Sequence, residues 1–301
     1  MKNYQTTPDK VVKGTHRDVH IFSLDHANNN IDKEVVKSFG DEWEKFESFE
    51  EKDLERTAAM YFDILDERHL NKNTYAMDMG CGTGRWTKII ADKVAFVEAV
   101  DPSSAIFVAD KLLKDKSNIR LTQASVDTLP FADNTFDFVM SIGVLHHIPD
   151  TQKAMSDCVK KVKKGGFFYT YLYYSLDNKG FFFKTFFGAS DLLRKAVSKL
   201  PSGPKKAVCD GLAVVLYMPF VGAGRLFRKM GFKKLANRIP LSIYQDQPFY
   251  IIRNDSLDRF GTKLEQRFSR IQVAEMMAKA GLKDIVVSPG MPYWHAVGTK
   301  M

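Results

Sequence analysis

Short apolar runs alternate with amphipathic stretches through the middle of the chain. Apolar runs cover 75–80, 94–101, 119–125, 136–142 and 165–174, and three of the segments between them, 85–93, 103–114 and 151–161, have helical spacing. Near the C-terminus, a helix that Ser269 can cap and Gly281 can end is followed by a strand over 284–288 and a final segment over 292–300. Strands separated by single helices imply right-handed crossovers. We therefore predict an α/β fold with a doubly wound, mostly parallel, seven-stranded sheet.

Two regions depart from this rhythm. Between Asn29 and about Leu70, apolar residues such as Val35 and Phe39 recur at three- and four-residue spacing, which predicts helices that lie over a core. After Ser175 the alternation stops, and it returns only near Arg267. We accordingly divide the chain into an N-terminal helical cap (1–70), a core (71–176), a large helical insert after the fifth strand (177–254) and the C-terminal end of the core (255–301).

The insert contains the apolar run GLAVVLYMPFVGAG at 211–224. Its fourteen residues, with Pro219 inside, are fewer than the ~20 that a bilayer span requires. We expect a core or interfacial segment instead.

The net charge of +8 is concentrated in the insert. Between Asn178 and Pro240, thirteen Lys and Arg residues face only Asp191 and Asp210, and the same stretch holds eight phenylalanines. Cations combined with apolar residues suit a membrane-surface helix, or a pocket for a long apolar molecule with an anionic head. A soluble helical cap with a solvated basic rim would have the same composition.

The N-terminal residues and the cysteines indicate the cellular location and whether disulfides or metal sites are expected. The first twenty residues are polar and mixed in charge, without a basic start followed by an apolar run, so we expect a cytoplasmic location, with peripheral contact at the inner membrane surface through 178–240 as an option. Cys81, Cys158 and Cys209 lie far apart without metal-ligand spacing. Neither a disulfide framework nor a metal site is expected.

The segment Asp78-Met-Gly-Cys-Gly-Thr-Gly84 follows an apolar strand and precedes a helix. Three glycines at alternate positions let the backbone turn sharply and approach a ligand, and the next helix offers unpaired N–H groups. The spacing G-x-G-x-G, with an acid two residues before the first glycine, differs from the G-x-G-x-x-G of pyrophosphate binding. A cationic cofactor with a carboxylate tail fits this environment.

Here the sequence resembles the class I S-adenosylmethionine-dependent methyltransferases, which have a Rossmann-like fold. The resemblance continues through EAVDPS, QASVDTLPF, FDFVMSIGVLHHIPD and VKKGGFFYTY, and covers about Thr74 to Tyr174. It implies S-adenosyl-L-methionine as the cofactor, with Asp78 near the methionine amino group, Asp101 on the ribose hydroxyls, and Ser125 with the Val126 backbone N–H at the adenine edge. The cofactor-binding residues that it implies are Asp78, Gly80, Cys81, Gly82, Thr83, Gly84, Asp101, Ser125, Val126 and Ser141.

The methyl acceptor is harder to predict. His147, just beyond the fourth strand, is the candidate general base, by resemblance to relatives that place a His near the acceptor; packing or capping is the alternative role. The chain lacks the Asn/Asp-Pro-Pro-aromatic motif and the Pro-Cys nucleophile of enzymes that act on nucleic-acid bases. A weaker likeness to quinone-biosynthesis and surface-polysaccharide methyltransferases suggests a small lipid-like, quinone-like or glycan-linked acceptor, methylated on oxygen or carbon. An RNA methyltransferase and a non-catalytic S-adenosylmethionine-binding regulator remain the alternatives.

Overall fold

The computed structural model describes residues 2–24, 30–43, 51–177, 180–292 and 294–301. They divide into two compact units, Met1–Asp177 with Leu264–Met301, and Asn178–Lys263. The insert therefore ends at Lys263, nine residues later than the sequence pattern suggested, because helix α10 (Phe249–Gly261) packs with the insert's own helices.

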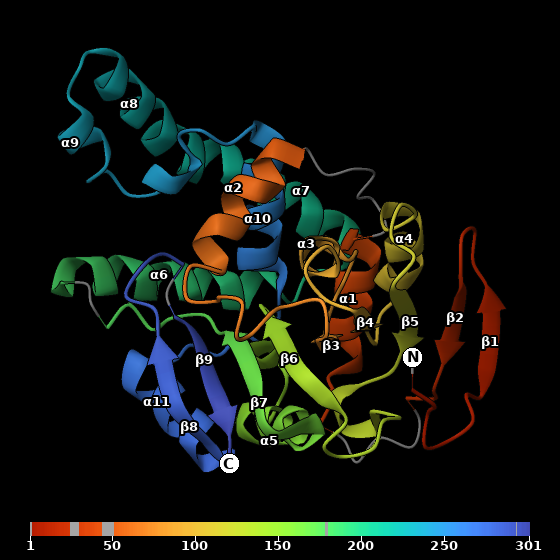
Figure 1. Ribbon diagram of the computed structural model, residues 1–301. Coiled ribbons are helices and arrows are strands. Elements are labelled where there is room, and N and C mark those ends of the chain that lie inside the picture. The colour runs from red at the N-terminus through yellow and green to blue at the C-terminus, as the bar shows by residue number, and fades with distance from the viewer. Residues whose placement is uncertain (1, 25–29, 44–50, 178–179, 293) are drawn as a thin grey trace. The chain divides into compact units, whose positions relative to one another are not determined.

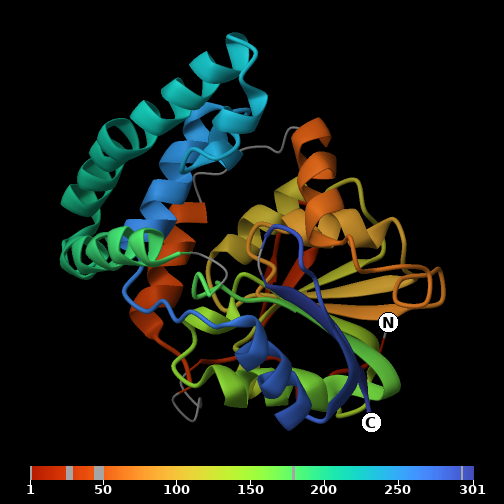
Figure 2. The ribbon, with the colours of Figure 1, turned by 90° about the vertical axis from the view of Figure 1, so that its left-hand side faces the viewer.

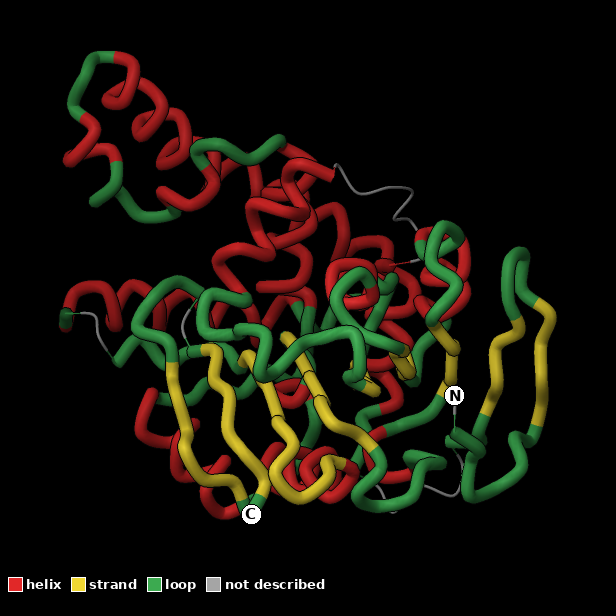
Figure 3. Tube along the Cα trace, in the orientation of Figure 1, coloured by secondary structure: helices red, strands yellow, loops and turns green. Residues whose placement is uncertain are grey.

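The first unit is built on a single sheet (Figures 1 and 3). Its strands are β1 (Lys10–Lys13), β2 (Asp18–Ile21), β3 (Tyr75–Met79), β4 (Phe96–Val100), β5 (Ile119–Gln123), β6 (Phe136–Ile142), β7 (Val162–Tyr171), β8 (Leu282–Val287) and β9 (His295–Lys300). They are ordered β1-β2-β5-β4-β3-β6-β7-β9-β8. Neighbours from β2 to β7 are parallel, and the pairs of β9 with β7 and β8 are antiparallel. The predicted doubly wound sheet is thus confirmed, and its seven strands are β5-β4-β3-β6-β7-β9-β8.

Helices cover both faces of the sheet (Figure 2). The first unit contains α1 (Lys33–Trp43), α2 (Glu51–Tyr61), α3 (Arg85–Ala91), α4 (Ala105–Leu112), α5 (Thr151–Lys161), α11 (Arg270–Lys279) and the short turns η1 (Val126–Thr128) and η2 (Leu145–His147). On one face, α5 and α11 bury Met155 and Met277 with Met77 of β3. On the other, α3 and α4 bury Ile90 and Ile106 with Ala76. The alternation of Ala76 and Met77 between the two faces follows from the two-residue period of a strand.

The N-terminal region is only partly the helical cap that the sequence predicted. Residues 10–21 form the hairpin β1–β2, which adds to the edge of β5. The turn of the hairpin is held by Asp110, whose carboxylate accepts the backbone N–H groups of Thr15, His16 and Arg17 at 2.6–3.0 Å. Each strand has only four residues, and the turn between them is held by a carboxylate almost a hundred positions away. The hydrophobic pattern of these residues is therefore too short to predict the hairpin.

The second unit consists of α6 (Phe181–Val197), α7 (Ser202–Leu212), the π-helical turn η3 (Ala213–Tyr217), α8 (Met218–Lys229), α9 (Lys233–Ala236), η4 (Ser242–Tyr244) and α10. Its core joins Cys209, Ala213, Tyr217 and Val221 to Ile252 and Phe260 of α10. The side chains of Phe181–Phe183, Phe186 and Phe187 lie outside the described residues, whereas Phe232 is 55% exposed.

The apolar run 211–224 is the middle part of a longer helical run. Pro219 cannot donate to the preceding turn, but it lies in the first turn after the π-helical segment, where the regular hydrogen-bond ladder is already interrupted. The helical run therefore continues from Gly203 to Lys229. Among the described residues, this one run of 27 residues is long and apolar enough to cross a membrane, by length and composition alone, and 28% of its most apolar window is buried.

Candidate cofactor site

The glycine-rich turn lies between β3 and α3, at the edge of the sheet where the parallel strands end. Gly80, Gly82 and Gly84 have φ angles of +80°, +55° and +83°, a left-handed conformation that glycine adopts at little cost. A Cβ on Gly80 would lie 2.4 Å from Val144, and one on Gly84 would lie 2.6 Å from Leu113. A Cβ on Gly82 would meet nothing within 4 Å. Gly82 is therefore the glycine whose missing side chain leaves open space beside the turn.

The turn is fixed to the end of β4 by its own backbone. The N–H groups of Gly80 and Cys81 both donate to the Val100 carbonyl, at 2.7 and 3.0 Å, and the Gly82 N–H donates to Asp101 Oδ2 at 2.8 Å. Cys81 and Thr83 are buried at 6% and 3% exposure. Burial of these two side chains within the protein already accounts for Cys81 and Thr83 in this turn, without a side-chain contact to a ligand.

Asp101 connects the turn to α4. Its Oδ1 accepts the Ser103 N–H at 2.8 Å and the Ser103 hydroxyl at 2.6 Å, while Oδ2 accepts the Gly82 N–H and no other donor among the described residues. A carboxylate oxygen has two lone pairs, so Oδ2 can accept a further hydroxyl. This capacity is compatible with the ribose role that the resemblance implies.

Asp78 is fully buried at the start of the turn. Its Oδ2 accepts the Thr87 hydroxyl at 2.6 Å, and its Oδ1 has no partner among the described residues. Burial raises the pKa of Asp78 from 3.8 to about 7, the Thr87 hydrogen bond opposes this, and the neighbouring charge of Asp101 adds to it. Burial also raises the pKa of Asp101, against the hydrogen bonds from Ser103 and Gly82. No described cation contributes to either shift.

A cationic ligand fits these residues. An unpartnered buried carboxylate oxygen is costly, and a positive group beside it restores the charged form. S-adenosyl-L-methionine carries an ammonium and a sulfonium, and its ribose supplies hydroxyl donors. Asp78 would hold the ammonium and Asp101 the ribose.

The loop after β5 differs from the expectation for Ser125. The Ser125 hydroxyl donates to Asp127 Oδ1 and lies 2.9 Å from the Thr128 hydroxyl, as the N-cap of η1. Asp127 Oδ2 is buried without a partner among the described residues. Asp127 is therefore the better candidate acceptor for an adenine amine, with the buried Val126 beside it. Asp127 lies two positions after Ser125 in the same segment, so this acid can be read from the sequence.

Ser141 is better explained by the sheet than by a ligand. It is fully buried, and its hydroxyl donates to the Met79 carbonyl at 2.9 Å. Its own carbonyl accepts the Thr170 hydroxyl at 3.0 Å. Ser141 thus joins β6 to both neighbouring strands, and its predicted contact with the cofactor lacks support.

His146 and His147 form η2, just after β6. Nδ1 of His147 lies 2.7 Å from the Leu264 carbonyl, which can only accept, so Nδ1 carries a proton in this contact. In a neutral imidazole with its proton on Nδ1, the basic atom is Nε2. His146 is fully buried, neither of its ring nitrogens has a hydrogen-bond partner within the described part of the chain, and its ring stacks on Tyr173 with the ring centroids 3.9 Å apart. Burial, with His147 and Arg267 nearby, lowers the pKa of His146 well below 6.5 and keeps it neutral.

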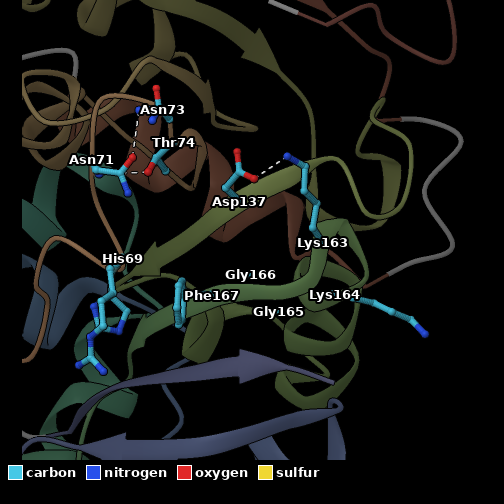
Figure 4. A pocket seen from close by; sticks show the side chains of 11 residues that line it. His69, Asn71, Asn73, Thr74, Asp137, Lys163, Lys164, Gly165, Gly166 and Phe167 are labelled. Atoms are coloured by element: carbon cyan, nitrogen blue, oxygen red, sulfur yellow. Dashed lines mark hydrogen bonds and ion pairs between the residues drawn. The ribbon is translucent and has the colours of Figure 1, made fainter.

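A pocket lies at the opposite edge of the sheet, where β3, β6 and β7 begin (Figure 4). There Asp137 accepts the Tyr75 N–H at 3.0 Å and pairs with Lys163. Gly165, with φ +76°, and Gly166 lie within β7, where its pairing with β6 shifts register. These residues hold strands together, and the pocket is separate from the glycine-rich turn.

Comparison with known proteins assigns the central segment of the chain to a described family of domains. Residues 77–170 match a family model described as a methyltransferase domain, so this part of the chain is a methyltransferase domain, of the kind that uses S-adenosyl-L-methionine. Two relatives are named demethylmenaquinone methyltransferase: one from Geobacillus sp. is 29% identical over 35% of this chain and 47% of its own length, and one from Staphylococcus carnosus is 32% identical over 34% and 44%. A ubiquinone biosynthesis O-methyltransferase from Coxiella burnetii is 26% identical over 52% and 66%. The chain thus spans about half the length of the first curated relatives that it matches.

The raised pKa of Asp78 predicts pH-dependent cofactor binding. The folded-state pKa is above the unfolded one, so the protonated carboxyl stabilises the free protein at acid pH, and this contribution is lost as the pH rises through about 7. A bound ammonium favours the carboxylate, so affinity should rise with pH by up to about tenfold per unit below about pH 7 and then level off. Calorimetry of wild type and Asp78→Asn across this range measures the effect. Parallel pH profiles for the two proteins would rule it out.

Gly82→Val should abolish cofactor binding in a folded protein, because a β-branched side chain at φ +55° would fill the open side of the turn. Gly165→Val is the matched control: that glycine also has a positive φ and open space, but lies at the other edge of the sheet. Circular dichroism and calorimetry on both variants test this. Equal affinities would show that the turn does not approach the cofactor.

Asp101→Ala should weaken cofactor binding at least tenfold, since a charged acceptor is worth about 1.5–3 kcal/mol and the Gly82 N–H also loses its partner. Asp137→Ala, which likewise removes a carboxylate from a backbone N–H, controls for local structural damage. An Asp101→Ala protein that binds as tightly as Asp137→Ala would exclude Asp101 as the ribose ligand.

Proposed function

We propose that the chain is an S-adenosyl-L-methionine-dependent methyltransferase that methylates an oxygen or carbon of a small lipid-like, quinone-like or glycan-linked acceptor. The observation that carries the proposal is the methyltransferase domain at 77–170, with two buried carboxylates around its open glycine turn. The quinone-like acceptor is favoured by the names of the relatives, which share 26–32% identity with this chain.

The residues of the site suit such a reaction. When bound, the cofactor supplies an electrophilic methyl group on a sulfonium. Asp101 and the turn that it anchors would hold the ribose, and Asp78 would fix the amino end, which together orient the sulfonium. His147, with its proton on Nδ1, would accept the acceptor's proton at Nε2. An acidic hydroxyl or carbon acid needs such a base, which agrees with a quinol-like acceptor.

Two other functions make different predictions. An RNA methyltransferase would retain RNA in a salt-sensitive manner through the basic insert. A non-catalytic regulator would bind the cofactor and transfer nothing. From Ser141, at the end of β6, the chain reads Ser-Ile-Gly-Val-Leu, without the motif of enzymes that methylate base amines, which counts against nucleic-acid bases.

Incubation with methyl-labelled cofactor and separate lipid, soluble-metabolite and RNA extracts tests the proposal. We expect label in the lipid extract, none with Gly82→Val, and a rate at least about 100-fold lower with His147→Gln at unchanged cofactor affinity. Label confined to RNA would support the first alternative. Cofactor binding without label in any extract would support the second.

A further inference from the structure

The long helical run of the second unit exposes an apolar stripe. Val208, Val214, Val215 and Leu226 are 39%, 52%, 69% and 57% exposed, and Ala207, Gly211, Pro219 and Gly222 of the same run are also exposed. These positions recur at three- to four-residue spacing, as one face of a helix does. The apolar surface continues past the end of α8 with Met230 (58%), Phe232 (55%) and Leu235 (47%).

The opposite side of the same helix is the unit's own core. Cys209, Ala213, Tyr217 and Val221 are buried against α10. Asp210 is the single charged residue between Ala207 and Gly224, and it pairs with Lys206 at 2.8 Å and Arg253 at 3.1 Å. The rotation of the helix is thus fixed by packing, and its exposed face carries no charged residue over this length.

Cations gather where the stripe ends. No acidic residue lies between Asp210 and Asp246, whereas this interval contains Arg225, Arg228, Lys229, Lys233, Lys234 and Arg238. Lys229, Lys233 and Lys234 are exposed and alternate along the chain with Met230, Phe232 and Leu235. Apolar side chains interleaved with exposed cations complement a surface that is apolar below and anionic above, which is the boundary of an anionic lipid membrane.

Packing argues for lying on the membrane rather than crossing it. The run from Gly203 to Lys229 is long enough to cross. A crossing would carry the ion pairs of Asp210 with Lys206 and Arg253 of α10 into hydrocarbon, where charged groups are costly. Lying flat buries only the uncharged face and leaves these pairs in water. A nucleic acid would contact the cations but would find few stacking groups along a stripe of Val and Leu.

We propose that the exposed face of residues 207–235 binds the interface of an anionic phospholipid membrane. Binding is reversible, because it combines partial insertion of small apolar side chains with electrostatic attraction. The inference goes beyond the proposed methyl transfer, and its test needs neither cofactor nor acceptor.

Co-sedimentation of the full chain with vesicles of phosphatidylglycerol and phosphatidylcholine, against phosphatidylcholine alone, tests the proposal at low and high salt. Between about 0.01 M and about 1 M salt the Debye length falls from about 30 Å to about 3 Å, so binding to the anionic vesicles should weaken at least tenfold. Lys229→Glu/Lys233→Glu/Lys234→Glu should lose at least tenfold at low salt. Its control, Lys93→Glu/Lys114→Glu/Lys283→Glu, makes the same charge change on exposed lysines of the first unit and should bind nearly as wild type.

The apolar stripe has its own test. Val215→Asp/Leu226→Asp should reduce vesicle binding at least tenfold at both salt concentrations, whereas Ile271→Asp/Val286→Asp, at similarly exposed positions of the first unit, should not. Circular dichroism verifies that each variant is folded. Equal vesicle binding by the stripe variant and its control would overturn the proposal. Weak vesicle binding by every protein, wild type included, would also overturn it. In that case, a dimer that the stripe variant turns into a monomer in sedimentation velocity would identify the stripe as a dimer interface. Loss of salt-sensitive RNA retention by the lysine variant would instead identify the cations as an RNA-binding surface.

Discussion

Two buried carboxylates without a neighbouring described cation impose the main constraint on the first unit. Asp78 and Asp101 flank the glycine-rich turn, both have raised pKa values, and each acts on its surroundings through hydrogen bonds that hold that turn in place. Burying charge in this way costs free energy unless a partner is supplied. A structure that keeps both acids is therefore adapted to a ligand that brings positive charge and hydroxyl donors.

The rest of the unit positions these two acids. The parallel register of β3 with β4 sets Asp78 opposite Ala99, so that the chain beyond both strands turns at the same edge. Val144 and Leu113 fill the space where two of the three glycines lack a side chain, and so fix the turn from the β6 loop and from α4. The third, Gly82, is left facing open space. The site is thus defined by strand register first and by side chains second.

The sequence predicted the sheet well because its strands are buried, continuous apolar runs and its helices carry strong signals. The capping box of Ser269 and Gln272, for example, marks α11 without reference to the rest of the chain. The β1–β2 hairpin escaped prediction because its turn is held by the distant Asp110, and the length of the Gly203–Lys229 helix because a π-helical turn accommodates Pro219. In the candidate site, motif spacing predicted Asp78, the glycines and Asp101, and these residues lie around one turn in the structure. It could not show that the hydroxyls of Ser125 and Ser141 are used within the protein, since their partners are a side chain two residues on and a backbone carbonyl 62 positions away.

The protonation state of Asp78 connects this electrostatic account to function most directly. A carboxyl-carbon NMR titration, with Asp78→Asn to assign the resonance, would report its pKa in the free and the cofactor-bound protein. The account predicts a value near 7 in the free protein and a fall of at least about two units with S-adenosyl-L-methionine bound. A carboxyl that titrates near 4 without the cofactor, or whose pKa does not change on binding, would contradict it.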